Sequence, residues 1–207
     1  MGHAASTPAQ DFLCEVRHRS YGTILADPPW QFTNRTGKMA PEHQRLSRYT
    51  TLTLQAIKDI PVSVVAAEQS HLYLWVPNAL LHEGLEVREA WGFHYKKPHV
   101  AYDSQRWWPR RARRWVSLSQ YTEIVLFGVR GRLRTLAVGR TQVNIIKTRK
   151  REHSRKPEEL YNIIAACSPG PFLELFARGQ RANWDQWGNE VADYTPSWPT
   201  YANHSQQ

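Results

Sequence analysis

Short apolar runs alternate along this chain with segments of helical periodicity, and this alternation limits the possible folds more than any other feature. Strands are predicted at residues 21–26, 71–76, 123–129 and 172–177, with further extended segments at 93–102 and 143–146. Helices are predicted at residues 53–58, 79–91 and 157–167, the last of which starts with a proline and two glutamates. Repeated strand–helix units favour an α/β fold with a parallel or mixed sheet that is covered on both faces.

The first predicted strand ends at Asp27, which is followed by two prolines and Trp30. Proline lacks an amide hydrogen and restricts the residue before it, so neither a helix nor a strand continues through this point. The stiff turn offers two acceptors, the Asp27 carboxylate and the Pro28 carbonyl, beside the Trp30 ring as a stacking surface. Such a set fits a planar group with an exocyclic amine, and adenine is such a group. Taken alone, the tetrapeptide is equally compatible with a rigid turn that does no chemistry.

Positive charge is concentrated in two segments of the 207-residue chain, whose net charge is +9. Residues 105–115 hold five Arg, three Trp and no acid, and residues 147–156 hold six cations and one Glu. Two basic patches on an otherwise nearly neutral chain indicate a local site for a polyanion. Solvated basic loops, with the Trp residues in the core, remain the alternative interpretation.

Several classes of protein do not fit this composition. Cys14 and Cys167 are too few for a disulfide framework or a cysteine zinc site, and no His pair has the spacing of a metalloprotease helix, so we expect no metal. No apolar run approaches the roughly 20 residues that cross a bilayer, and the N-terminus lacks the apolar segment of a secretory signal. We therefore expect a cytoplasmic protein without a membrane partner. The length suits one α/β domain.

Longer motifs extend the pattern beyond the tetrapeptide. They are LADPPW, YTTLTLQAIKDIPV, LYLWVPNALLHEGLEVREAWGF, EIVLFGVRG, HSRKPEELYNIIAACSPGPFLELFAR and NWDQWGNE, in that order. Together they resemble the DPPW-type adenine methyltransferase family, over about residues 11–191. That family includes bacterial and phage DNA adenine-N6 methyltransferases and the catalytic subunit of the eukaryotic messenger-RNA adenosine methyltransferase.

The resemblance implies a fold, a cofactor and a domain organisation. The fold is a Rossmann-like methyltransferase with a mostly parallel sheet, helices on both faces and the permuted motif order of the β-class, and the cofactor is S-adenosylmethionine. The methyltransferase domain would cover residues 10–191, with the basic Arg/Trp loop at 103–118. The segments 1–9 and 192–207, rich in small and polar residues, are expected to lack fixed structure.

The resemblance also assigns site residues. Asp27 and Pro28 would hold the target amine, and Pro29 and Trp30 would shape the pocket. Around the cofactor, the family pattern implies contacts from Asp27, Lys156 (methionine carboxylate), Arg178, Asn189 and Glu190 (ribose side), and Asp11 and Phe12 (adenine ring). A solvated Lys156, a surface ion pair of Arg178 and a helix cap at Asn189 remain open, and Trp75 and Trp91 are expected to pack in the core.

The two basic segments gain a specific meaning from this resemblance. Arg side chains neutralise phosphates, and Trp rings stack on bases or fill the gap that a flipped nucleotide leaves. The predicted nucleic-acid contacts are Arg106, Trp107, Trp108, Arg110, Arg111, Arg113, Arg114, Lys147, Arg149, Lys150 and Arg151. The predicted reaction is direct methyl transfer to the N6 amine of a flipped or single-stranded adenine, in DNA rather than RNA, by a chain that acts alone, as a homodimer or with a second subunit. RNA methylation, cytosine amino-methylation and a non-catalytic nucleic-acid-binding subunit are the alternatives.

Overall fold

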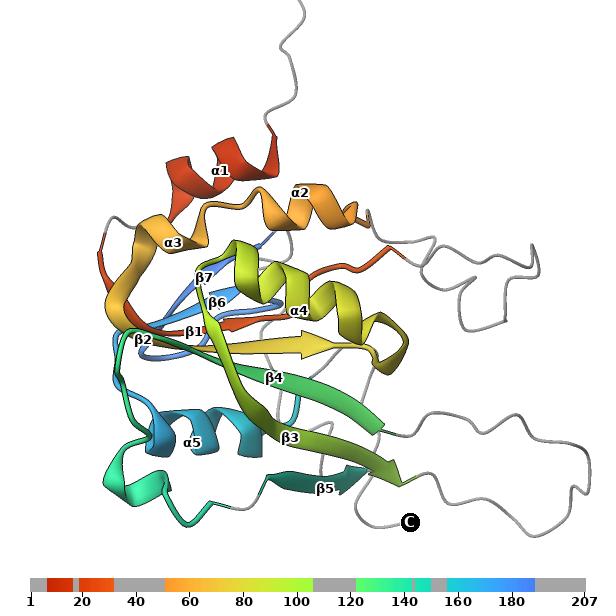
Figure 1. Cartoon of the computed structure of the whole chain (residues 1–207), viewed down its shortest axis with the longest axis vertical. Coiled ribbons are helices and arrows are strands. Elements are labelled where there is room, and N and C mark those ends of the chain that lie inside the picture. Colours follow the sequence, from red (N-terminus) through yellow and green to blue (C-terminus); the bar gives the residue numbers. More distant parts are fainter. Residues whose placement is uncertain are drawn as a thin grey trace, which may run out of the picture.

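A seven-stranded sheet forms the centre of the molecule, in the strand order β5-β3-β4-β2-β1-β6-β7 (Figure 1). The computed structural model describes residues 7–16, 19–31, 51–105, 122–142, 144–149 and 156–188. The strands are β1 (Tyr21–Ala26), β2 (Ala66–Val76), β3 (His94–Gln105), β4 (Thr122–Arg130), β5 (Ile145–Arg149), β6 (Phe172–Leu175) and β7 (Trp184–Trp187).

The helices are α1 (Pro8–Glu15), α2 (Leu54–Lys58), α3 (Val62–Val65), α4 (Leu81–Ala90) and α5 (Glu158–Cys167), with short 3-10 turns at η2 (Asn78–Leu80) and η3 (Ala137–Gly139). Within the described part of the chain, no helix is both long enough and apolar enough to cross a membrane. All of these helices pack against the sheet or against one another.

Strand directions bring most carboxyl ends to one edge of the sheet. β1 is parallel to β2 and to β6, β6 is parallel to β7, and β3 is parallel to β5. Among the described strands, only β4 runs the other way, antiparallel to both β2 and β3. The prediction of a mostly parallel sheet is confirmed, and Asp27 follows β1 at the edge where ligands of such sheets bind.

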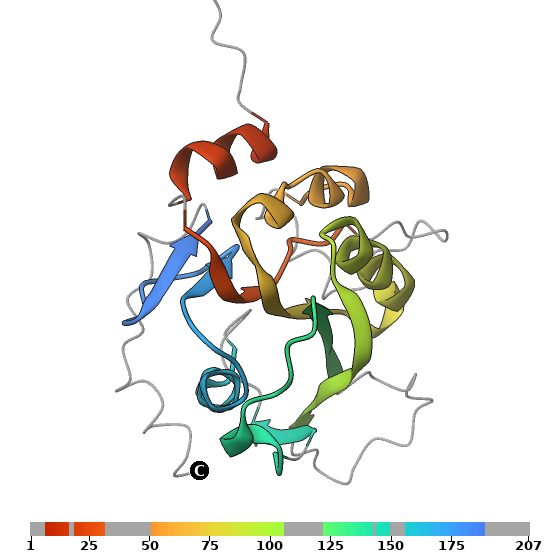
Figure 2. The ribbon, with the colours of Figure 1, turned by 60° about the vertical axis from the view of Figure 1, so that its left-hand side comes forward.

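Helices cover both faces of this sheet, as the sequence predicts (Figure 2). Helices α1 to α4 cover one face, where Phe12, Ile57 and Val87 pack with Leu74 and Leu173 of the sheet. Helix α5 covers the other, and its packing partners include β2, β4 and β7. We refer to these as the α4 face and the α5 face.

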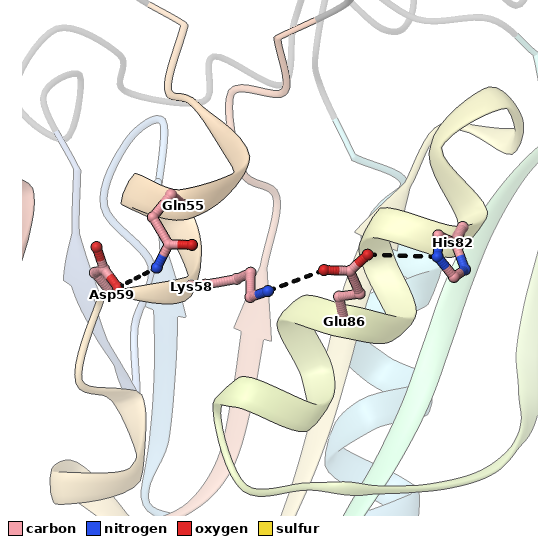
Figure 3. Close-up of polar contacts among 5 residues, drawn as sticks. All are labelled: Gln55, Lys58, Asp59, His82 and Glu86. Carbon is pink, nitrogen blue, oxygen red and sulfur yellow. Dashed lines mark hydrogen bonds and ion pairs between the residues drawn. The ribbon is translucent and has the colours of Figure 1, made fainter.

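Polar contacts at the rim of the α4 face join α2 to α4 (Figure 3). Lys58 Nζ lies 2.9 Å from Glu86 Oε2, and the opposite Glu86 oxygen lies 3.4 Å from His82 Nε2. Within α2, the Gln55 side-chain amide donates to Asp59 at 2.7 Å. The hydrogen bond from Lys58 lowers the pKa of Glu86. These contacts join two short helices whose apolar sides pack in the core.

Some elements differ from the sequence predictions. Helix α1 begins at Pro8, inside the segment expected to lack structure, because Thr7 and Gln10 form a reciprocal capping box and Phe12 is fully buried. Strand β2 begins at Ala66 rather than at residue 71, since its polar first part still pairs with β1 at Tyr21. Strand β7 and helix α3 have only four residues each and gave no periodic signal.

Candidate active site at the carboxyl edge of the sheet

Backbone hydrogen bonds fix the turn that follows β1. The Asp27 amide donates to the Leu175 carbonyl of β6 at 3.5 Å, and the Leu52 amide donates to the Pro29 carbonyl at 2.9 Å. The Pro28 carbonyl accepts from the Trp30 amide at 2.8 Å. A carbonyl oxygen has two lone pairs, so this one can still accept a hydrogen from a ligand.

Trp30 anchors the turn to strand β2 through its buried indole ring. Its indole N–H donates to the Trp75 carbonyl at 3.0 Å, and the residue is only 6% exposed. The ring therefore does not present the stacking surface that we expected from the sequence, because burial and its own hydrogen bond hold it in the core. Trp30 holds the backbone of Asp27 and Pro28 in place instead.

Lys156 and Asp27, far apart in the sequence, form an ion pair between Nζ and Oδ2. The lysine side chain is 11% exposed and the aspartate 31%, so the pair is partly shielded from solvent. Lys156 Nζ also lies 4.3 Å from the centroid of the Trp75 ring, a cation–π contact. Trp75 is 3% exposed, which confirms the prediction of core packing, and its contact with Lys156 was not foreseen.

A partly buried polar group lies beneath this ion pair and was missed in the sequence. The Tyr161 hydroxyl of α5 donates to Glu174 Oε1 of β6 at 2.7 Å. The Arg181 guanidinium stacks over the Tyr161 ring at 3.5 Å and pairs with Glu158. Burial raises the pKa of Glu174 to about 7. The available signal was the single acid in the apolar strand Phe172–Leu175, since a charged residue in such a run is rarely there for packing alone.

The predicted adenine-side residues lie beside the end of β7. Asp11 Oδ2 accepts from the Trp187 indole N–H at 3.3 Å. Phe12 packs edge-on against Trp187 with ring centroids 5.2 Å apart and has no exposed surface. In this structure Phe12 therefore supports Trp187 from the core, whereas Asp11 is partly exposed.

The predicted ribose-side residues come from two adjacent segments. Arg178 follows β6, and its neighbour Ala177 donates from its backbone amide to the Trp187 carbonyl at 3.0 Å. Gly188 packs so closely that an added Cβ would lie 2.7 Å from the Ala177 nitrogen. Asn189 and Glu190 follow it directly and lie outside the described residues.

The two basic segments start side by side. β3 and β5 are parallel, with Asp103 opposite Lys147 and Gln105 opposite Arg149. Both segments therefore leave the sheet at the edge where Asp27 lies. Nine of the eleven predicted nucleic-acid contacts fall outside the described residues. They are Arg106, Trp107, Trp108, Arg110, Arg111, Arg113, Arg114, Lys150 and Arg151.

The described residues contain no cluster of three or more His, Cys, Asp and Glu side chains that could hold a metal ion. The groups gathered around Asp27 are instead a carboxylate, an ammonium, backbone carbonyls and aromatic rings. This set is suited to an organic ligand that carries charge of both signs.

The MT-A70 family model matches residues 21–190. The chain belongs to the MT-A70 family. This is a family of S-adenosylmethionine-dependent methyltransferases, and the resemblance seen in the sequence is thereby confirmed. The match begins at the first residue of β1 and ends three residues beyond the end of β7.

Curated relatives fall into two groups by length. The type II methyltransferase M.MunI of Mycoplasma is 27% identical over 211 residues, which cover 93% of this chain and 87% of M.MunI. The human N(6)-adenosine-methyltransferase catalytic subunit METTL3 is also 27% identical, but the match covers 89% of this chain and 31% of METTL3. The human N(6)-adenine-specific methyltransferase METTL4 is 26% identical, with 38% of its length covered. The chain thus spans about a third of these longer relatives and most of M.MunI.

Proposed function

We propose that this chain transfers a methyl group from S-adenosylmethionine to the N6 amine of adenine in DNA. The observation that carries the proposal is the pair of acceptors at the carboxyl edge, Asp27 and the Pro28 carbonyl, held beside Lys156 within an MT-A70 domain. The names of the relatives METTL3 and METTL4 support adenine N6 as the target position.

The residues present fit the cofactor. Lys156 is a nearly buried cation that can receive a carboxylate, and Asp27, its present partner, can receive an ammonium group. Asp11 and Arg178 offer hydrogen-bonding groups for an adenine edge and a ribose, and we assign Asn189 and Glu190 to the ribose side from the family pattern of the sequence. When bound, S-adenosylmethionine supplies a methyl group activated by a positively charged sulfur.

Asp27 and Pro28 act on the target amine. The amine is a poor nucleophile because its lone pair is delocalised into the ring. Acceptors for both of its hydrogens orient it and favour a pyramidal nitrogen whose lone pair is localised. The methylated nitrogen is acidic enough to lose its extra proton after transfer, so Asp27 need not act as a strong base beforehand.

The basic segments would bind the phosphates around the target base. They leave the sheet at β3 and β5, and three strand spacings separate β3 from β1, roughly 15 Å. This span is within reach of the phosphates that flank a flipped nucleotide. We propose DNA rather than RNA because the match to M.MunI extends over most of that protein, whereas the match to METTL3 covers 31% of it.

Labelled methyl transfer to unmodified DNA and RNA, followed by mapping at single-base resolution, tests the proposal. Methylation of adenine N6 in DNA is expected. Activity on RNA alone would refute the DNA preference, and methylated cytosine would refute the target. If the chain binds no S-adenosylmethionine in calorimetry, a non-catalytic subunit is the better description. Size-exclusion chromatography of the same protein reports whether it is a homodimer.

A further inference from the structure

Glu174 lies next to the proposed site but has no part in the function described so far. Leu25 of β1 is opposite Glu174 of β6, and alternate residues of a strand share a face. Glu174 is therefore one strand away from Asp27 and two residues below it, on the α5 face. Its side chain is partly buried.

Four charged or titratable groups act on the Glu174 carboxyl. Tyr161 donates a hydrogen bond to it, Arg181 and Lys156 attract its negative charge, and Asp27 repels it. Burial dominates and raises its pKa to about 7, and Asp27 adds to the rise. Burial also raises the pKa of Tyr161, so the hydroxyl remains a donor across the physiological range.

The other charges of the cluster compensate one another in pairs. Lys156 pairs with Asp27, and Arg181 pairs with Glu158. Among the described residues of this cluster, an ionised Glu174 is therefore the charge that tips the sum to one negative. That charge lies beneath the pair proposed to receive the cofactor.

We propose that Glu174 makes the site prefer the cationic methyl donor over its neutral-sulfur product. This inference rests on the proposed function. In the reaction the bond from sulfur to the methyl carbon breaks, its electron pair stays on sulfur, and the carbon bonds to the amine nitrogen. The donor thus loses one positive charge on becoming S-adenosylhomocysteine. A negative charge in a low-dielectric site attracts the first ligand more than the second, so the donor competes better with the product for the site.

Calorimetric binding of S-adenosylmethionine and S-adenosylhomocysteine tests the proposal without turnover. The quantity measured is the ratio of the two dissociation constants, at about pH 6 and about pH 8 on either side of the Glu174 pKa. In the unaltered chain the preference for the donor should rise with pH, and Glu174→Gln should lower it at the higher pH by roughly tenfold and remove most of its pH dependence. Ionisation of the ligands' own groups is common to both proteins and cancels in their comparison.

Glu159→Gln is the matched control, because it removes the same charge from an exposed position on α5, the helix that carries Tyr161, the hydrogen-bond partner of Glu174. It should leave the ratio as in the unaltered chain. A Glu174→Gln chain that is folded yet keeps both the preference and its pH dependence would overturn the proposal.

A second variant decides the matter if Glu174→Gln does not fold. Tyr161→Phe removes the hydrogen bond that stabilises the ionised carboxyl, so the pH at which the donor preference rises should move upward. An unchanged midpoint overturns the role of Glu174. If the unaltered chain binds both ligands without preference, this inference alone fails; if it binds neither, the proposed cofactor site fails with it.

Discussion

The two faces of the sheet differ in the side chains that they bury. The α4 face is a continuous apolar layer in which Ile57, Leu74 and Trp91 are at most 1% exposed. The α5 face also has an apolar layer, but it buries hydroxyl, imidazole and carboxyl groups within it. Tyr73 and His71 both hydrogen-bond to Ser168, at 2.8 and 2.7 Å, and Tyr161 hydrogen-bonds to Glu174.

This difference suggests that the α4 face mainly stabilises the domain, whereas the edge of the α5 face mainly serves binding and catalysis. Polar groups are costly to bury unless they are hydrogen-bonded. The polar side chains beneath the α5 face therefore need specific hydrogen-bond partners. The α4 face supplies mainly apolar burial, and its buried indole N–H groups, those of Trp30 and Trp91, donate to backbone carbonyls. Substitutions on the α4 face should therefore act on folding, and substitutions at the edge of the α5 face should act on binding, pH dependence and turnover.

The largest effect is expected at Asp27. Asp27→Ala removes an acceptor for the target amine and should reduce methyl transfer at least a hundredfold, the scale found for loss of one preorganised polar group. Labelled methyl transfer under single-turnover conditions measures this, with a thermal melt to verify folding. Cofactor affinity should fall only a few-fold, because Lys156 remains available for the carboxylate although the Asp27 contact to the ammonium group is lost. Normal turnover of this variant would remove Asp27 from the site.

A change on the α4 face should affect stability instead. Ile57 is fully buried in α2, and Ile57→Ala should lower the free energy of unfolding by roughly 2–5 kcal/mol. Urea denaturation followed by circular dichroism measures the change. Val64→Ala, at a position that is 65% exposed on α3, is the control and should change stability by less than about 0.5 kcal/mol. Equal losses in the two variants would contradict the assignment of the core.

Glu174 should give the α5 face its own pH dependence of stability. Its pKa is raised in the folded chain, so the folded state binds more protons than the unfolded one between about pH 4.5 and pH 7. Stability should therefore fall as pH rises through that window, by on the order of 2–3 kcal/mol, and then level off. Urea denaturation across the window should show this fall in the unaltered chain and a shallower one in Glu174→Gln. Parallel curves would show that Glu174 does not titrate there.

The smallest effect is expected at the exposed contact between α2 and α4. Lys58 lowers the pKa of Glu86, so the contact stabilises the fold above the ordinary pKa of a glutamate and is lost as pH falls through the lowered value. Lys58→Ala should lower the melting temperature only slightly at neutral pH, since exposed ion pairs contribute little. The difference from the unaltered chain should vanish in acid, and a difference that persists there would point to packing rather than charge.

Much of the fold was visible in the sequence because long elements leave periodic patterns. Strands β1 and β4 and helix α5 were predicted to within one residue at each end. Short elements such as α3 and β7 were missed, because four residues do not show a period and their stability comes from tertiary partners. The early start of β2 was missed because pairing with β1, and not composition, extends it.

The sequence by itself determined the α/β class, the family and the position of Asp27 at the end of a strand, because local stereochemistry and ordered motifs carry that information. Only the tertiary structure decided which groups meet Asp27. It brought Lys156 to its carboxylate, buried the Trp30 ring that had been expected to stack, and placed Glu174 with Tyr161 and Arg181 beneath the pair. The reason is physical: the charge and pKa of a group depend on neighbours that strand order brings together, and no spacing along the chain records them.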